Sequence, residues 1–143
     1  MSATAYVTPT DLLDEFGERE MVSLTDVAAD RTGEFVPAVA QRGCDRANAE
    51  LGAALAARYK LPLASVPELL RYLACDLAHF YLYQTEPPSW VQVRFDTARK
   101  TLRDIQTGAL PLGIDSTGST VDAAPQNLAQ FNAGSKVFAR GDW

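Results

Sequence analysis

Residues 72–83, YLACDLAHFYLY, place Cys75, Asp76 and the single histidine of the chain, His79, inside an apolar run. An α-helix turns by about 100° per residue, so Leu73, Ala74 and Leu77 share one broad arc with Phe80 and Tyr81. The three reactive residue types gather on the opposite arc. The stretch therefore predicts an amphipathic helix with a narrow polar stripe, on which His79 is exposed or faces a partner and Cys75 lies near the core boundary.

The polar stripe raises the question of a catalytic or metal site. Cys75 and His79 are four residues apart, so their side chains could touch on a helix. A cysteine nucleophile also needs a base held by a third group and an oxyanion hole, and a zinc site needs three or four protein ligands. The chain has no second histidine, which leaves only Cys44 or carboxylates as further ligands. We therefore predict no catalytic, metal or cofactor site.

Prolines and apolar periodicity divide the surrounding sequence into helices. Apolar positions recur at helical spacing from residue 34 to about residue 59, which predicts the longest helix of the fold. Pro62 and Pro67 interrupt that pattern, and Pro67 at a first helical position opens the next helix, which runs through Gln84. Gly43 and Gly52 lie inside the predicted long helix, where a small residue lets another helix approach closely.

A further helix is predicted from Pro88 or Ser89 to Gly108. Its apolar residues follow four-three spacing and are expected in the core: Val91, Phe95, Ala98, Leu102 and Ile105.

The N-terminal region contains signals for two short helices and a loop. Thr8 can cap a helix with Pro9 at its first position, and Gly17 can end that helix. Residues 18–24 form a second short helical turn. Residues 25–35, TDVAADRTGEF, lack the ligand spacing and central glycine of an EF-hand, so they are interpreted as a polar loop.

Size and composition fit one folded domain. The chain has 143 residues, of which 47% are hydrophobic. Its fold class is predicted to be all-α, a small bundle of about four to five helices with an extended C-terminal arm. The first 10 residues lack a secretory signal, the two cysteines suit reduced thiols, and the apolar run around Leu77 is too short and too charged to span a bilayer. We expect a soluble intracellular protein.

Charge is distributed unevenly along the chain. The net charge of −5 argues against a general affinity for nucleic acid. Residues 11–34 contain eight acidic residues against two arginines, whereas residues 90–106 contain four basic residues against two acidic ones. Opposed charge can attract copies head to tail, and such heterologous contacts close into rings. On charge alone, two ordinary solvated faces are the favoured explanation of the pattern.

The composition changes after Gly108. Residues 109–143 are rich in Gly, Ser, Thr, Asn and Pro but end in KVFARGDW. We predict a helical domain at residues 1–108 and a flexible linker with a C-terminal docking arm at residues 109–143. An apolar-tipped arm needs a docking site on its own domain or on a neighbour. The RGD tripeptide in it is interpreted as a coincidence.

The order of these segments resembles the Mu-like phage protein family related to head–tail connector or adaptor proteins, also called head completion proteins. The most specific match is ARYKLPLASVPELLRYLACDLAHFYLY, residues 57–83. Two departures are Gly52, where an acid is expected, and His79, where a basic or small residue is more usual, and both are expected to touch surface contacts. The stretches that carry the resemblance are residues 6–26, 47–83, 94–113 and 135–143.

The resemblance implies a virion structural protein without enzymatic activity or a cofactor. Such adaptors form a ring of about twelve copies under the portal protein, assembled in the bacterial cytoplasm. The ring extends the DNA channel, contacts a tail-side neck protein, and lets DNA pass without sequence-specific binding or any membrane contact. The residues assigned by hypothesis to the subunit or portal interface are Arg94, Arg99, Lys100, Arg103, Lys136, Val137, Phe138, Arg140 and Trp143.

Two alternatives belong to other functional classes. A small helical regulatory module would use the same arm to bind a host protein at one-to-one stoichiometry. A small enzyme dependent on Cys75 and His79 would lose its activity in Cys75→Ala, whereas a structural role predicts a change in stability only.

Overall fold

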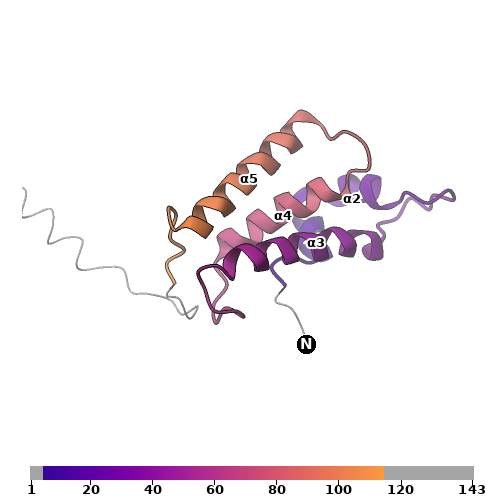
Figure 1. Ribbon diagram of the computed structural model, residues 1–143. Coiled ribbons are helices and arrows are strands. Elements are labelled where there is room, and N and C mark those ends of the chain that lie inside the picture. The colour runs from indigo at the N-terminus through magenta and orange to yellow at the C-terminus, as the bar shows by residue number, and fades with distance from the viewer. Residues whose placement is uncertain (1–4, 115–143) are drawn as a thin grey trace, which may run out of the picture.

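The computed structural model describes residues 5–114. Within that range the chain forms five α-helices and no β-strand, which confirms the all-α prediction (Figure 1). The helices are α1 (Pro9–Phe16), α2 (Glu18–Thr25), α3 (Pro37–Leu55), α4 (Glu68–Leu82) and α5 (Ser89–Thr107).

Local signals set the ends of the short helices as predicted. The backbone N–H of Asp11 donates a hydrogen bond to Thr8 Oγ1 at 3.3 Å, and the backbone N–H of Thr8 donates to the Asp11 carboxylate at 3.0 Å. Gly17 then ends α1 with a φ of +89°, a conformation that favours glycine. The segment before α1 is held by Asn48 of α3, whose side-chain oxygen accepts hydrogen bonds from the backbone N–H groups of Tyr6 and Val7.

The loop that joins α2 to α3 is organised by Asp26. Its carboxylate accepts hydrogen bonds from the backbone N–H groups of Thr32 and Gly33, the shorter of them 2.7 Å. This closure confirms the predicted loop at residues 26–35, whereas Thr25 is the last residue of α2. Within the described range, no group of three or more His, Cys, Asp or Glu side chains is placed to hold a metal ion.

The long helices differ from the prediction in length. α3 begins at Pro37 and ends at Leu55, so it has 19 residues, as many as α5, and is not the single longest helix. Residues 34–36 stay outside it because Pro37 occupies the first turn, where its missing N–H costs nothing. α4 ends at Leu82, two residues earlier than predicted, because Tyr83 is extended (φ −75°, ψ 127°).

α4 is the central helix of the bundle. It packs against α3, α5 and α1, and eight of its 15 residues are buried. Gly43 permits the close approach of α3: a Cβ atom there would lie 2.9 Å from Leu82 Cδ2 and 3.1 Å from the carbonyl oxygen of Ala78. The predicted role of a small residue is thus confirmed at Gly43. It is wrong for Gly52, where a Cβ would meet nothing within 4 Å.

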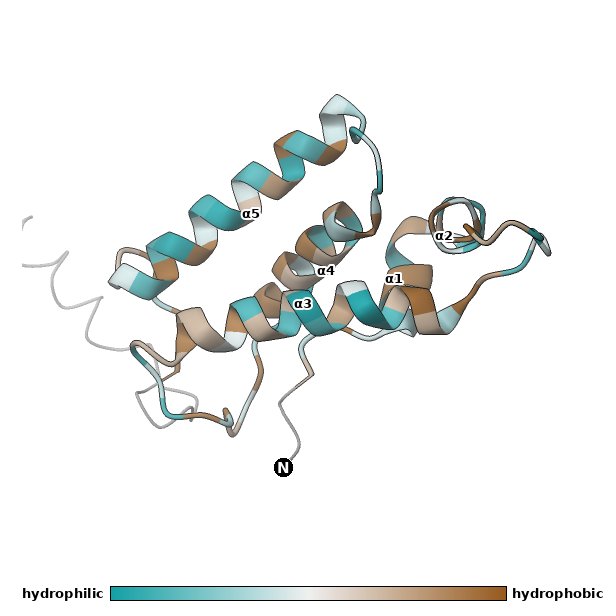
Figure 2. Ribbon diagram, turned by 45° about the vertical axis from the view of Figure 1, so that its right-hand side comes forward, coloured by the Kyte–Doolittle hydropathy of each residue, from teal (hydrophilic) through white to brown (hydrophobic). Residues whose placement is uncertain are grey.

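α5 covers the remaining side of α4. Phe95 stacks on Phe80 at 3.7 Å between ring centroids, and all five apolar positions predicted for this helix are buried. Its polar residues line the opposite side (Figure 2). Gly108 ends α5 in the left-handed conformation, as predicted, and Leu110, Leu112 and Ile114 still pack against the core.

The packed residues Leu110, Leu112 and Ile114 thus follow the predicted boundary at residue 108. Residues 115–143, which include most of the predicted arm, lie outside the described range. None of the helices in the described part is long and apolar enough to cross a membrane.

Candidate functional site

His79 lies in a polar junction between α2 and α4. Its side chain is buried, with Nε2 2.8 Å from Glu20 Oε2, and the hydroxyl of Tyr83 donates a 2.6 Å hydrogen bond to the same oxygen. The prediction that His79 is exposed or faces a partner is therefore wrong. The prediction that His79, as a departure from the family pattern, affects surface contacts is wrong for the same reason. The physical reason is that the α1–α2 hairpin covers the polar stripe of α4.

Aromatic rings enclose the histidine on both sides of this hydrogen bond. Phe16 stacks on the imidazole at 3.9 Å between centroids, and Trp90 approaches it at 5.5 Å. Burial lowers the pKa of His79 and outweighs the opposing effect of Glu20. Burial would raise the pKa of Glu20, but the hydrogen bonds from Tyr83 and His79 bring it below its usual range. A neutral imidazole thus donates to a carboxylate.

The two cysteines are unsuited to nucleophilic chemistry. Both are fully buried, and burial is the main reason that the pKa of each thiol is raised to about 12. Cys75 is therefore a core residue. The helical wheel had placed it near the core boundary, and that prediction is wrong. The Nε2–H of His79 is engaged with Glu20, so the ring is oriented by that carboxylate and not by Cys75. The arrangement does not join Cys75 and His79 as nucleophile and base.

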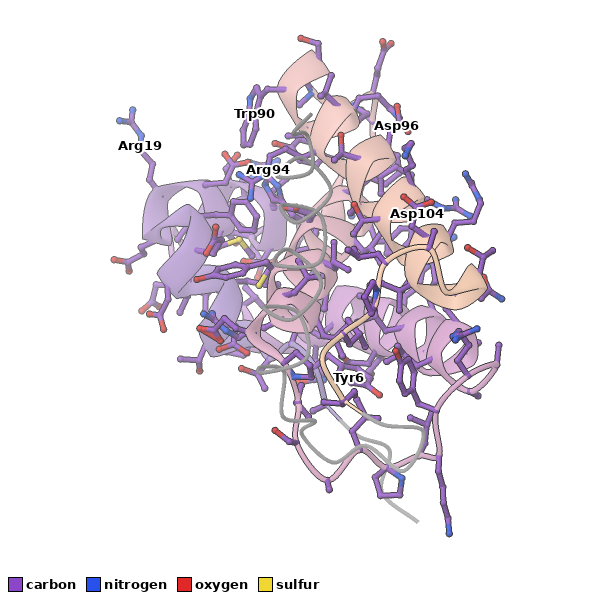
Figure 3. The ribbon with its side chains drawn as sticks, turned by 90° about the vertical axis from the view of Figure 1, so that its left-hand side faces the viewer. Tyr6, Arg19, Trp90, Arg94, Asp96 and Asp104 are labelled. Atoms are coloured by element: carbon purple, nitrogen blue, oxygen red, sulfur yellow. The ribbon has the colours of Figure 1, made fainter. Side chains whose placement is uncertain are left out.

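Arg94, one of the predicted interface residues, ties three helices together. Its Nη2 lies 2.7 Å from Asp76 Oδ1 on α4 and 3.5 Å from Glu15 Oε2 on α1. The guanidinium also lies over the ring of Phe16, 5.2 Å from its centroid. Figure 3 shows Arg94 on the side of α5 that faces α1 and α2. Its contacts with another subunit remain a prediction, but its contacts within the subunit are extensive.

The other predicted basic residues of α5 are exposed, and Arg99 and Arg103 lie on the side of the helix towards α3. Arg99 forms an ion pair with Glu50 of α3 at 3.4 Å, and the hydroxyl of Tyr81 donates to that same carboxylate. Lys100 pairs with Asp104 one turn further along the helix, at 3.3 Å. All three basic side chains of this region, including Arg103, are exposed.

A groove separates the C-terminal halves of α3 and α5. Its volume is about 260 Å³, and its walls combine small apolar side chains with charged ends. The residues that line it are Glu50, Ala53, Ala54, Arg99, Leu102, Arg103 and Gln106.

The sequence prediction of interface residues did not include Trp90 and Val93. Both lie in the first two turns of α5, and their exposed fractions are 48% and 62%. The available signal was that Trp90 and Val93 fall outside the apolar arc formed by Val91, Phe95 and Ala98, so at least part of each is left for contact with a partner. The predicted positions Lys136, Val137, Phe138, Arg140 and Trp143 lie outside the described residues.

The sequence matches the model of a protein family described as Bacteriophage Mu, Gp36, over residues 6–131. The chain belongs to this family. Its similarity to curated proteins agrees with that assignment. Gene product J of Escherichia phage Mu is 28% identical over 137 residues, which cover 94% of each chain. The Mu-like prophage FluMu protein gp36 of Haemophilus influenzae is 25% identical over 100 residues, 70% of each chain.

Membership in the Bacteriophage Mu, Gp36 family confirms the predicted resemblance to Mu-like phage proteins and supports a structural or morphogenetic role. The match includes the whole described bundle, with its His79 junction, the outer side of α5 and the α3–α5 groove. It ends before residues 136–143, the predicted tip of the arm.

Proposed function

We propose that this member of the Bacteriophage Mu, Gp36 family is a head–tail connector, an adaptor that forms a ring of about twelve copies under the portal. The observation that carries the proposal is the match of a family of phage Mu proteins over nearly the whole bundle and the region after it. The ring would extend the DNA channel and present the surface to which a tail-side neck protein attaches.

The charge of the chain suits a DNA channel. With a net charge of −5, the protein offers little general attraction to the phosphate backbone. A lining of carboxylates repels phosphate, so DNA can slide past without adhering. The connector proposal therefore requires no sequence-specific contact with DNA, and it assigns the protein to the neck of the virion.

The buried state of Cys75 supports a structural role over a Cys/His-dependent enzyme. A thiol whose pKa is raised to about 12 is almost entirely protonated at neutral pH, whereas the thiolate is the nucleophile. No particular contact in the described bundle favours the alternative of a regulatory module.

Quantitative mass spectrometry of DNA-filled particles tests the proposal. Particles are purified from a host that carries the gene within its prophage, and copies of this chain are counted per portal subunit. Particles from a prophage that lacks the gene serve as the control for background. A ratio near one is the expected result. Absence of the chain from wild-type particles would overturn the proposal.

A further inference from the structure

The bundle carries opposite charges at the two ends of its long axis. α2 and the loop at residues 26–36 lie at one end, and the C-terminal ends of α3 and α5 lie at the other (Figure 1). The first end, here called the acidic end, consists of residues 11–34, with eight acidic residues against two arginines. The second, the basic end, contains five basic residues, Arg58, Lys60, Arg99, Lys100 and Arg103, against Glu50 and Asp104, which pair with Arg99 and Lys100.

An exposed tryptophan lies beside the acidic end. Trp90 approaches His79, which in turn contacts Glu20 of α2 and Phe16 of α1, so its ring is next to the α1–α2 hairpin. Val93 lies one turn further along α5 and is still more exposed. Tryptophan is enriched among the few residues that dominate the binding energy of protein interfaces. Such residues are typically surrounded by other contacts that exclude water.

The basic end offers a concave surface. The α3–α5 groove is lined by Ala53, Ala54 and Leu102, and its charged residues are Arg99, Arg103 and Glu50, the last of which pairs with Arg99. An apolar groove edged by two arginines suits a bulky apolar side chain that is surrounded by carboxylates. Trp90 is a bulky apolar side chain next to the acidic end, with Arg94 one turn further along α5.

These two surfaces cannot meet within one copy. Trp90 and Arg103 are separated by roughly 20 Å along α5, because the helix rises about 1.5 Å per residue. The nine residues from Trp90 to Arg99 turn the helix by about 180° beyond two full turns, so the two surfaces lie on opposite sides of α5. Figure 3 shows Trp90 on one side of α5 and Asp96 on the other. Complementary surfaces on opposite sides of one chain make a heterologous contact, which repeats from copy to copy.

We propose that the acidic end of one copy docks on the basic end of the next, with Trp90 and Val93 seated against the α3–α5 groove of the neighbour. This inference rests on the connector function and assigns the faces that meet in the ring. The partner is a second copy of this chain because the chain itself supplies both complementary surfaces.

Charge reversal in the full chain, expressed from the prophage, tests the contact. One variant reverses the basic end with Arg99→Glu and Arg103→Glu, and another reverses the acidic end with Asp14→Lys and Glu18→Lys. Each variant alone places like charges at every contact, so each is expected to reduce the copies per portal subunit by roughly tenfold or more. The two variants expressed together can alternate around the ring with opposite charges restored. Their joint expression is expected to return the count to the wild-type value.

A control reverses one charge away from both ends, Asp45→Lys on α3, and is expected to assemble at the wild-type level. Circular dichroism of each purified variant verifies the fold. Two results would overturn the inference: wild-type incorporation of either single variant, or failure of the joint expression to restore assembly. In both cases the wild-type chain is still counted in particles, so the connector function stands. Absence of the wild-type chain overturns both proposals together.

Discussion

His79 is a neutral hydrogen-bond donor in this fold. The pKa of the imidazole is lowered by burial, and the pKa of Glu20 is lowered by the bonds from Tyr83 and His79, so at neutral pH an uncharged ring faces an ionised carboxylate. The His79 ring is buried, so it is not part of the exposed surface of α4. The histidine therefore helps to attach α1 and α2 to α4. These contacts explain its burial without a ligand or a metal.

The lowered pKa of His79 predicts a pH-dependent stability. Protonation is easier in the unfolded chain, so stability is fully present above the ordinary histidine pKa of 6.5 and is lost as the pH falls towards the lower pKa of the folded state. The groups that face the ring are Glu20, Tyr83 and Arg94. Urea unfolding at pH 7.5 and pH 5 should show a loss of stability in the wild type and a flatter response in His79→Gln. An equal response in both proteins contradicts the assignment.

The pKa of Asp76 is shifted in the opposite direction, so its contribution to stability changes with pH in the opposite sense and over a different pH range. Burial raises its pKa above that of the unfolded chain, against the lowering effect of Arg94, so its contribution is present below the ordinary aspartate pKa of 3.8 and is lost as the pH rises through the folded-state value. The contribution of Asp76 is common to the wild type and His79→Gln, so the difference between their responses to pH reports on His79.

At the scale of the helices, the bundle depends on one close contact and one shared ion pair. α3 reaches α4 where Gly43 removes a side chain, and α5 is joined to both α4 and α1 through Arg94. The close contact depends on the small volume of Gly43. The ion pair depends on the charge of Arg94, which is half-buried. Each predicts a different response to substitution.

The two glycines of α3 provide a matched pair for the close contact. Gly43→Ala places a methyl group 3.1 Å from the carbonyl oxygen of Ala78, which belongs to the helix backbone and cannot turn aside. We expect a loss of about 1–3 kcal/mol, as for other overpacked cores. Gly52→Ala meets nothing within 4 Å and should stabilise α3 by up to about 1 kcal/mol. Thermal and urea unfolding measure both. Equal effects of the two substitutions would contradict the packing argument.

Arg94→Met removes the link among the three helices and leaves the Asp76 carboxylate without its cation. We expect a loss of about 1–3 kcal/mol of unfolding free energy, because Asp76 is mostly buried while the arginine is partly exposed to solvent. Lys100→Met, which breaks an exposed pair within α5, should change stability by no more than about 0.5 kcal/mol. If Arg94 served only as a contact to another subunit, the two substitutions would have similarly small effects.

At the scale of the whole molecule, the connector proposal separates folding from assembly. The bundle at residues 5–114 has its own core, to which 22 buried residues contribute. A chain that lacks residues 136–143, KVFARGDW, is therefore expected to remain a folded monomer.

We expect the same truncated chain to be lost from the ring, because its apolar tip would no longer dock on the portal or the next subunit. Circular dichroism checks the fold, and the count of copies per portal subunit checks assembly. Full occupancy of the ring by the truncated chain would refute a docking role for the arm.

Most of the helix ends could be predicted because they depend on residues within one turn. The capping pair of Thr8 and Asp11, the stop at Gly17 and the left-handed Gly108 act over three or four positions, and apolar periodicity located the buried side of α5. These local rules, together with the order of segments that resembles Mu-like phage proteins, were sufficient for the all-α class and the family.

The environment of the polar stripe was decided only by the tertiary structure. A helical wheel orders residues around one axis but contains no information about which other segment will cover each side. His79 became buried because its partner Glu20 lies 59 positions away, and Asn48 holds the N-terminal segment from 41 and 42 positions away. Arg94 was likewise drawn into the subunit by two acids on different helices. Contacts over such distances arise from the packing of the whole bundle, and local sequence patterns do not encode them.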